Sequence, residues 1–161
     1  MVASVSQDLA SYKAVVGRFA TGVVVVTAIA GAEPVGFTCQ TFGSLSLEPR
    51  LVSFSASVDS TTWPRIRACG VVGISVLADG QEDLARRFAQ RGVDRFAGVD
   101  WEAGPEGSPL LGGVIAHLEG AIESVHQLGD HDVAVVAVRH AWAGEGRPLV
   151  YLGGRYGGFT G

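Results

Sequence analysis

Stretches in which apolar and polar residues alternate dominate this chain and predict a set of β-strands. Residues 23–27 are β-branched throughout, which favours a strand buried on both faces. Residues 50–56 alternate strictly, so Ser53 and Ser55 should share a hydroxyl-bearing face while Phe54 lies on the apolar one. Further strands are predicted at residues 35–42, 71–77, 114–128, 132–142 and 149–152.

Helical spacing appears in three segments. Apolar residues recur at steps of three or four over residues 8–20, which predicts an amphipathic helix lying on a sheet. A second helix should begin near Pro64, which is tolerated in a first turn, and end at Gly70. A capping-box pattern at residues 79–82 predicts a third helix, running to about Arg91.

The turns between these segments indicate the fold class. A turn at residues 31–34 makes its flanking strands antiparallel neighbours, and Gly129-Asp130-His131 joins the two long strands. Residues 92–113 are rich in glycine, proline and charge, and we expect them to form a long loop that leaves the barrel and contains one short strand at most. Several strands at short spacing, with few helices and no strict βαβ alternation, predict a mainly β protein, an antiparallel barrel with helices outside it.

Composition narrows the classes of partner. The net charge is −4 and no basic run occurs, which argues against nucleic-acid binding. The early apolar run at residues 22–32 is shorter than the roughly 18 residues of a membrane span. Two widely separated cysteines fit a reducing, cytoplasmic compartment. A hydrophobic content of 47% with 17% charged residues suggests that a second subunit covers part of the surface.

The segment at residues 34–64 has the character of a ligand cradle. It is rich in serine and threonine, yet apolar residues recur often enough to anchor it in a core. Such a segment suits a polar, flat or phosphorylated ligand held against a rigid sheet. We therefore expect the binding site here.

Other candidate chemistries are weaker. The glycine-rich run at residues 153–158 is followed by only three residues, so no helix follows it as in a dinucleotide-binding loop. His126, Asp130, His131 and Asp132 would need a further well-placed donor to hold a metal, and no metal site is expected. No G-x-S-x-G elbow indicates a hydrolase. The Gly-Asp-His turn could present its imidazole to a ligand, although Asp130 simply capping the turn is the stronger interpretation of these residues alone.

Taken together, several motifs resemble the flavin reductase domain of two-component monooxygenases, a family with the FMN-binding split-barrel fold. They are RFATGVVVVTA near the start, G-x-T-x-x-x-F-x-S-x-S-x-x-P at residues 36–49, LARRFA, the GDH turn and PLVYLGGRYGGF at the end. Their order and spacing carry the resemblance. It implies one domain over residues 1–161, with its core at about residues 12–159 after a short N-terminal tail. The implied fold is a Greek-key antiparallel split β-barrel with a few flanking helices.

The resemblance also implies an activity. The protein would be an NAD(P)H:flavin oxidoreductase that reduces FMN or FAD by hydride transfer from NADH or NADPH. It would be a homodimer, with the flavin near the subunit boundary, and would supply reduced flavin to a partner monooxygenase. The alternatives are a split-barrel protein that binds flavin or haem without reductase activity, and a barrel that binds no cofactor.

Site residues follow from the same resemblance. The positions matching the edge of the flavin ring are Thr38, Cys39, Gln40 and Thr41, and those matching the ribityl chain and phosphate are Ser55, Ala56, Ser60 and Thr61. Arg87 and Phe88 lie on the helix that approaches the cofactor in the family. The turn expected to contact NAD(P)H contains Gly129, Asp130 and His131, and Tyr156 matches the tail that covers the site. His131 would position the nicotinamide, and no side-chain acid or base is expected.

Overall fold

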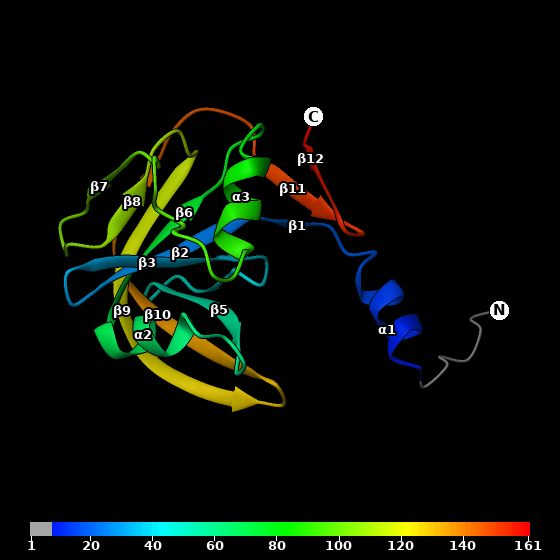
Figure 1. Cartoon of the computed structure of the whole chain (residues 1–161), viewed down its shortest axis with the longest axis horizontal. Coiled ribbons are helices and arrows are strands. Elements are labelled where there is room, and N and C mark those ends of the chain that lie inside the picture. Colours follow the sequence, from blue (N-terminus) through cyan, green and yellow to red (C-terminus); the bar gives the residue numbers. More distant parts are fainter. Residues whose placement is uncertain (1–7) are drawn as a thin grey trace.

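The computed structural model describes residues 8–161 and is dominated by one seven-stranded antiparallel sheet (Figure 1). The strand order is β3-β2-β6-β9-β10-β5-β4. These strands are β2 (Val24–Ala30), β3 (Glu33–Cys39), β4 (Gly43–Ser46), β5 (Leu51–Ser57), β6 (Val71–Val76), β9 (Ala116–Leu128) and β10 (His131–Ala143). All six pairings between neighbours are antiparallel, which confirms the predicted fold class.

Two small sheets and three helices complete the fold. One sheet contains β1 (Thr21–Gly22), β11 (Leu149–Leu152) and β12 (Arg155–Gly158), and the other pairs β7 (Trp101–Ala103) with β8 (Pro109–Leu111). The helices are α1 (Leu9–Val16), α2 (Trp63–Cys69) and α3 (Glu82–Ala89). None of the helices within residues 8–161 is long and apolar enough to cross a membrane.

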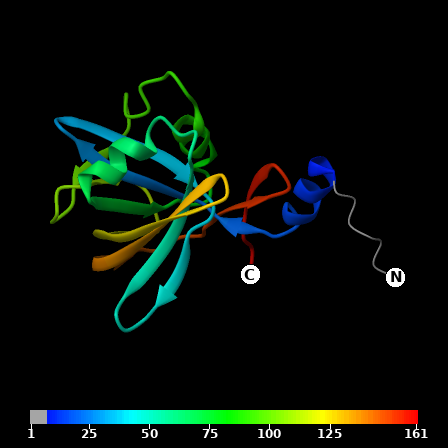
Figure 2. The same cartoon turned by 90° about the horizontal axis from the view of Figure 1, so that it is seen from below.

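The large sheet curls until its two ends approach each other (Figure 2). The hydroxyl of Thr41, just after β3, donates to the carbonyl of Ser55 in β5 at 3.2 Å and accepts from its N–H at 2.8 Å. The thirteen-residue strands β9 and β10 carry two register irregularities, and such bulges increase the local bend of a strand. The curl therefore brings the ends of β3 and β5 together, although they lie far apart in the strand order.

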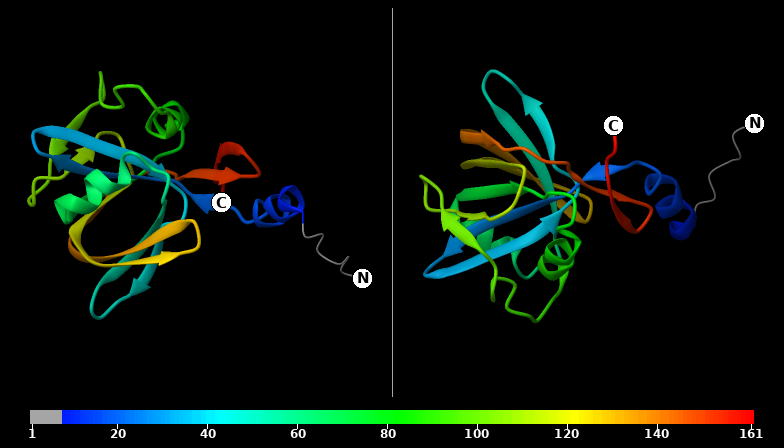
Figure 3. Two further views of the ribbon diagram at one scale, coloured as in Figure 1. Left: turned by 60° about the horizontal axis from the view of Figure 1, so that its bottom comes forward. Right: turned by 90° about the horizontal axis from the view of Figure 1, so that it is seen from above.

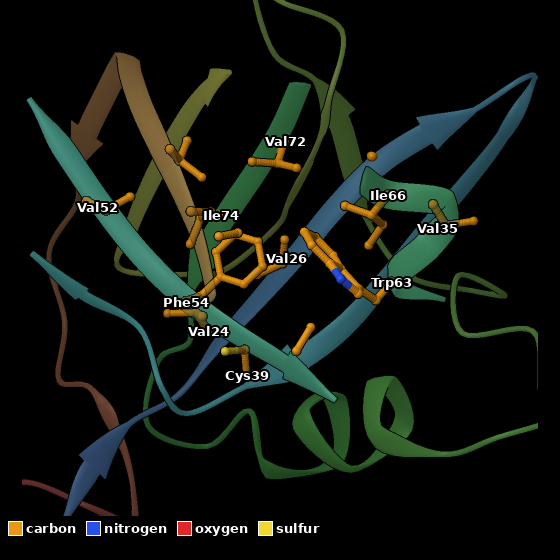
Figure 4. Close-up of a cluster of buried hydrophobic side chains, with 14 residues drawn as sticks. Val24, Val26, Val35, Cys39, Val52, Phe54, Trp63, Ile66, Val72 and Ile74 are labelled. Atoms are coloured by element: carbon orange, nitrogen blue, oxygen red, sulfur yellow. The ribbon is translucent and has the colours of Figure 1, made fainter. Parts of the chain in front are cut away.

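Strand β2 is buried on both faces, as its run of valines predicts. Val24 and Val26 point into the barrel, where they join Phe54 from β5 and Trp63 from α2 (Figure 4). The rings of Phe54 and Trp63 meet edge to face with centroids 5.5 Å apart. On the other face of β2, Val25 belongs to a second apolar cluster, which includes residues of α3.

The N-terminal helix differs from the prediction. Helix α1 is shorter than residues 8–20 and has no buried residue, so the expected amphipathic helix does not lie on a sheet of this chain. It stands apart from the barrel, beside the β11–β12 hairpin (Figure 3), and the N–H of Gly153 donates to the carbonyl of Gly17 at its end. Phe19, just beyond α1, is 78% exposed. Periodicity therefore predicted a helix in this segment, but it did not predict that the helix would stay exposed. The N-terminal tail predicted before residue 12 falls largely outside the described residues.

Three local predictions also need correction. Residues 92–113 contain two short strands rather than one at most, and the glycine-rich tail forms β12. The capping box at residues 79–82 is absent, because Gln81 makes no side-chain cap and its Oε1 accepts from the N–H of Ala78. In each case a group pairs with a segment nearby in the chain that the pattern did not indicate: β7 with β8, β12 with β11, and the N–H of Ala78 with the Gln81 side chain.

The β7–β8 hairpin is fixed to the barrel wall by polar side chains of three strands. The buried carboxylate of Glu119 accepts from the N–H groups of Glu106 and Ser108, at 3.0 and 2.9 Å. Thr27 donates to the carbonyl of Pro109, and the hydroxyl of Ser75 accepts from the N–H of Leu111. Buried polar groups satisfied in this way fix the orientation of the hairpin.

Candidate functional site

A cleft of about 370 Å³ lies where the ends of β3 and β5 meet. Ten of the residues predicted from the sequence line it: Thr38, Cys39, Gln40, Thr41, Ser55, Ala56, Ser60, Thr61, Phe88 and His131. They come from β3 and the loop after it, from β5, from the loop before α2, from α3 and from the start of β10. The sequence reasoning missed six further lining residues: Phe37, Ser57, Thr62, Ala89, Arg91 and Arg95.

At the β3 end of the cleft, the side chains hold the barrel closed as well as lining the site. Thr38 donates its hydroxyl hydrogen to the carbonyl of Ala85 in α3 at 2.5 Å. Thr41 is fully engaged with the backbone of Ser55, and the thiol of Cys39 lies 3.1 Å from the Thr41 hydroxyl. Thr38 can therefore only accept a further hydrogen bond from a ligand, because its single hydrogen is already donated.

At the other end, serine hydroxyls have their hydrogens free. Ser60 Oγ accepts from the N–H groups of Thr62 and Trp63, at 3.3 and 3.0 Å, and so anchors the loop that leads into α2. Ser57 Oγ accepts from the N–H of Asp59 at 3.2 Å. Neither hydroxyl donates a hydrogen bond within residues 8–161, so each can donate one to a ligand, which is the chemistry that a phosphate oxygen requires.

Two arginines from the loop after α3 border this donor-rich end. Arg95 is held in place, because it donates to the carbonyl of Gly36 at 2.7 Å, to the Thr62 hydroxyl at 3.0 Å and to the carbonyl of Gln90. Burial lowers the pKa of Arg95, and the nearby charge of Arg91 lowers it further. Within residues 8–161, Arg91 makes a single hydrogen bond, with the carbonyl of Asp59, and it is 3.4 Å long. The only sequence signal for these residues was an arginine cluster on the third helix and its exit, which resembles an ordinary solvated face.

His131 stands at the tight turn between β9 and β10. Gly129 has φ +65°, a conformation that L side chains rarely adopt, so the turn needs glycine there. The Asp130 carboxylate lies 2.7 Å from His131 Nδ1, and that hydrogen bond lowers the pKa of Asp130. Gly129 shapes the turn and Asp130 contacts the imidazole of His131, but neither residue lines the cleft.

Asp132, the next residue in β10, is buried and supports the site from within. Its Oδ2 accepts from the indole N–H of Trp63 at 2.8 Å and lies 3.4 Å from the Arg67 guanidinium. Among residues 8–161, no group of three potential ligands is arranged to hold a metal ion. Through its hydrogen bond with Trp63, Asp132 connects strand β10, which begins at His131, to the start of α2.

Besides Gly129 and Asp130, two more predicted site residues do not line the cleft. Arg87 donates to the carbonyl of Ala97 and borders a different hollow, with Asp83 and Val99. Tyr156 packs edge to face on Tyr151 in the C-terminal hairpin, with the Arg86 guanidinium 5.1 Å from its ring centre. Burial raises the pKa of Tyr156, whereas Arg86 and a hydrogen bond involving Gln40 act in the opposite direction. Tyr156 does not line the cleft.

Burial of the Cys39 thiol should make the stability of the fold depend on pH in the alkaline range. Burial raises the pKa of the Cys39 thiol above its usual 9.0, and a hydrogen bond with Thr41 opposes this. The unfolded chain releases the thiol proton first, so the free energy of unfolding should fall as the pH rises above 9.0 toward the raised value. We expect the melting temperature to drop less steeply in Cys39→Ser than in the parent between about pH 9 and pH 11. Equal slopes in differential scanning fluorimetry would contradict this expectation.

The cleft offers hydrogen-bond donors at one end, and an acceptor oxygen and exposed backbone edges at the other. Within residues 8–161 no carboxylate lines it, and one imidazole does. Without an acid–base pair, the cleft is poorly suited to acid–base or nucleophilic catalysis by side chains. Its two ends fit a planar, hydrogen-bonding ring that carries an anionic tail. The residues present therefore fit a flavin nucleotide.

Comparisons with known proteins agree with this geometry. Residues 16–160 match the flavin reductase like domain. The reductase subunit HsaB of a flavin-dependent monooxygenase from Rhodococcus jostii (strain RHA1) is 43% identical over 158 residues, covering 98% of this chain and 81% of that protein. Nitrilotriacetate monooxygenase component B from Mycobacterium thermoresistibile superposes with a TM-score of 0.91 at 36% identity, covering 94% of this chain and 86% of that one.

A third relative has been solved with ligands. The NADH:FAD oxidoreductase SgcE6 of Streptomyces globisporus, in complex with NAD and FAD fragments, superposes with a TM-score of 0.90 at 40% identity. The match covers 96% of this chain and 94% of that one. The resemblance inferred from the motifs is thus confirmed over nearly the whole sequence. This chain belongs to the flavin reductase like domain family.

Proposed function

We propose that this protein is an NADH-dependent flavin reductase that reduces FMN or FAD and delivers the reduced flavin to a flavin-dependent monooxygenase. The observation that carries the proposal is the cleft between β3 and β5, with hydroxyl donors and Arg91 at one end and His131 at its border. The named activities of the relatives support the same assignment, including the use of NADH as donor and service to a monooxygenase.

In this proposal the protein positions its ligands and does not react with them. When bound, the nicotinamide and flavin supply the chemistry, with a hydride passing from nicotinamide C4 to flavin N5. The backbone of residues 38–41 and the acceptor oxygen of Thr38 hold the ring edge. Ser57, Ser60 and Arg91 hold the phosphate end, and His131 contacts the nicotinamide.

A single spectroscopic experiment tests this function. Purified protein mixed anaerobically with FMN or FAD and then with NADH should bleach the flavin absorbance near about 450 nm, a property of the cofactor itself. Riboflavin and NADPH, tested in turn, define the preferences for flavin and donor. Flavin that binds but does not bleach would favour a split-barrel protein without reductase activity.

The role of His131 can be separated from flavin binding. His131→Ala should raise the Michaelis constant for NADH about two- to tenfold, the range of a stacked aromatic contact, and leave the flavin dissociation constant nearly unchanged. Leu128→Ala is the matched control, because Leu128 pairs with His131 across the same turn, is exposed and does not line the cleft. An unchanged Michaelis constant together with unchanged turnover in His131→Ala would remove the assigned role.

We further propose that the protein is a homodimer and that α1 is covered by the second subunit. An eight-residue helix is marginal alone in water, and this one exposes Leu9, Tyr12 and Val15. Sedimentation should give about twice the 16.7 kDa chain mass, and Phe19→Asp should shift the protein toward monomer. A parent protein that sediments as a monomer would refute this part of the proposal.

The two free thiols suit the cytoplasm, where we place the protein.

A further inference from the structure

The backbone around His131 is held on both sides of the turn between β9 and β10, at the end of the two longest strands (Figure 1). The N–H of Val58, just after β5, donates to the carbonyl of Asp130 at 3.0 Å, and Ser57 pairs with His131 in the ladder between β5 and β10. Asp132, the next residue, is buried. The imidazole of His131 is therefore presented to the cleft from a fixed base.

The Asp130 carboxylate decides which nitrogen of the His131 ring carries hydrogen. Asp130 Oδ1 lies 2.7 Å from His131 Nδ1, and this hydrogen bond lowers the pKa of Asp130, so the carboxylate stays ionised at neutral pH. An ionised carboxylate can only accept a hydrogen bond, so Nδ1 must donate. Because a neutral imidazole has a single N–H, its Nε2 is left with a lone pair.

Nε2 is the ring nitrogen that remains for a ligand. His131 lines the cleft and Asp130 does not, so the Nδ1 edge of the ring is directed away from the cleft. Within residues 8–161, Nε2 makes no hydrogen bond or ion pair. The neutral ring therefore offers the cleft a hydrogen-bond acceptor and no N–H donor.

We propose that Asp130 is a positioning residue for the hydride donor, because it fixes the His131 tautomer in which Nε2 accepts from the NH₂ group of the nicotinamide carboxamide. The inference rests on the proposed function, in which His131 contacts the nicotinamide. A carboxamide has an NH₂ donor and a carbonyl acceptor. An acceptor at Nε2 binds only the NH₂ group, which limits how the carboxamide and the attached ring that carries C4 can be turned.

The specificity that follows is for donors with an N–H group at this position. In reduced 3-acetylpyridine adenine dinucleotide, a methyl group replaces the NH₂ of NADH, so the analogue keeps the shape and charge of NADH but lacks that donor. A site that uses the N–H discriminates against such an analogue, since its acceptor is left unpaired. The opposite tautomer would donate to the carbonyl group, which both molecules have.

The test compares kcat/KM for NADH and for this analogue. His131→Ala gives the difference in reactivity that belongs to the two donors themselves. The preference of the parent for NADH should exceed that of His131→Ala at least tenfold. Asp130→Ala lets the imidazole take either tautomer, so its preference should lie within threefold of that of His131→Ala. In the His131→Ala background, Asp130→Ala should not change the preference further.

A matched variant controls for the loss of a negative charge beside the cleft. Asp59 is exposed, follows Val58 in the neighbouring loop and does not line the cleft. Asp59→Asn should therefore keep the preference of the parent for NADH. In all these variants the flavin dissociation constant should stay within twofold of the parent value.

Nitrogen-15 NMR of the histidine side chains observes the tautomer itself. The His131 signals are assigned by their loss in His131→Ala. At about pH 8, the parent should carry hydrogen on Nδ1 alone, and Asp130→Ala should gain a population with hydrogen on Nε2. Asp130 is 91% exposed, so this variant should keep the melting temperature of the parent.

Three results would overturn the inference. Hydrogen on Nε2 of the parent, alone or together with Nδ1, would make the imidazole a donor to the ligand. An equal preference for NADH in the parent and in His131→Ala would show that His131 does not recognise the amide. A preference like that of the parent in Asp130→Ala would show that recognition does not depend on Asp130. Failure of the parent to oxidise NADH with either flavin would instead refute the proposed function, while the NMR signals would still report on the Asp130–His131 pair.

Discussion

Gly120→Ala should lower the free energy of unfolding by about 4 kcal/mol or more, among the largest effects of a single substitution. Gly120 lies in β9 opposite Val138 of β10, where the two long strands bend together. A Cβ atom there would overlap the carbonyl oxygen of Ala137 and lie 2.9 Å from its carbonyl carbon. Those atoms belong to the backbone and cannot rotate aside, so the strands would have to separate. Urea unfolding followed by circular dichroism measures the loss.

A glycine in the same sheet provides the control. Gly43, in β4, has nothing within 4 Å of its would-be Cβ, so Gly43→Ala should change the stability by less than about 1 kcal/mol. Because the curl of the sheet brings the end of β3 to β5, any folded Gly120→Ala protein should also bind flavin more weakly. Equal stability of the two alanine variants would show that β9 and β10 do not approach each other this closely.

Asp132→Ala should lower the free energy of unfolding by about 2–4 kcal/mol, because it leaves the buried indole N–H of Trp63 without an acceptor. Asp132 follows His131 in β10, and Trp63 follows the Ser60–Thr62 loop at the start of α2. The hydrogen bond thus joins two borders of the cleft. We expect flavin affinity to fall with stability, measured by fluorescence titration and chemical denaturation.

Conservative variants separate the hydrogen bond from the charge. Asp132→Asn keeps an oxygen acceptor for Trp63 and should lose less than about 1.5 kcal/mol, since the pair with half-exposed Arg67 contributes little. Trp63→Phe removes the donor, so Asp132→Ala should cost less in that background than in the parent. If the two costs are equal, the effect of Asp132→Ala does not come from the Trp63 contact.

The site shows where local patterns stop being informative. Strict alternation in β5 correctly separated the serine face from Phe54, because the side chains of a strand alternate whatever it pairs with. Family motifs supplied ten residues that the fold brings into one cleft. Neither source identified Arg91, which resembles a solvated surface arginine until the loop after α3 is placed beside Ser60. The binding roles of all these residues are predictions, and His131→Ala tests one of them directly.

By itself, the sequence determined the antiparallel β class and the burial of β2 on both faces, since both follow from side-chain periodicity and β-branched composition. It also determined the family, through motifs distributed from residue 18 to residue 159. Only the tertiary structure decided that α1 stands away from the barrel and that Glu119 secures the β7–β8 hairpin. These features depend on groups far apart in the chain, whose contacts exist only once the sheet has curled.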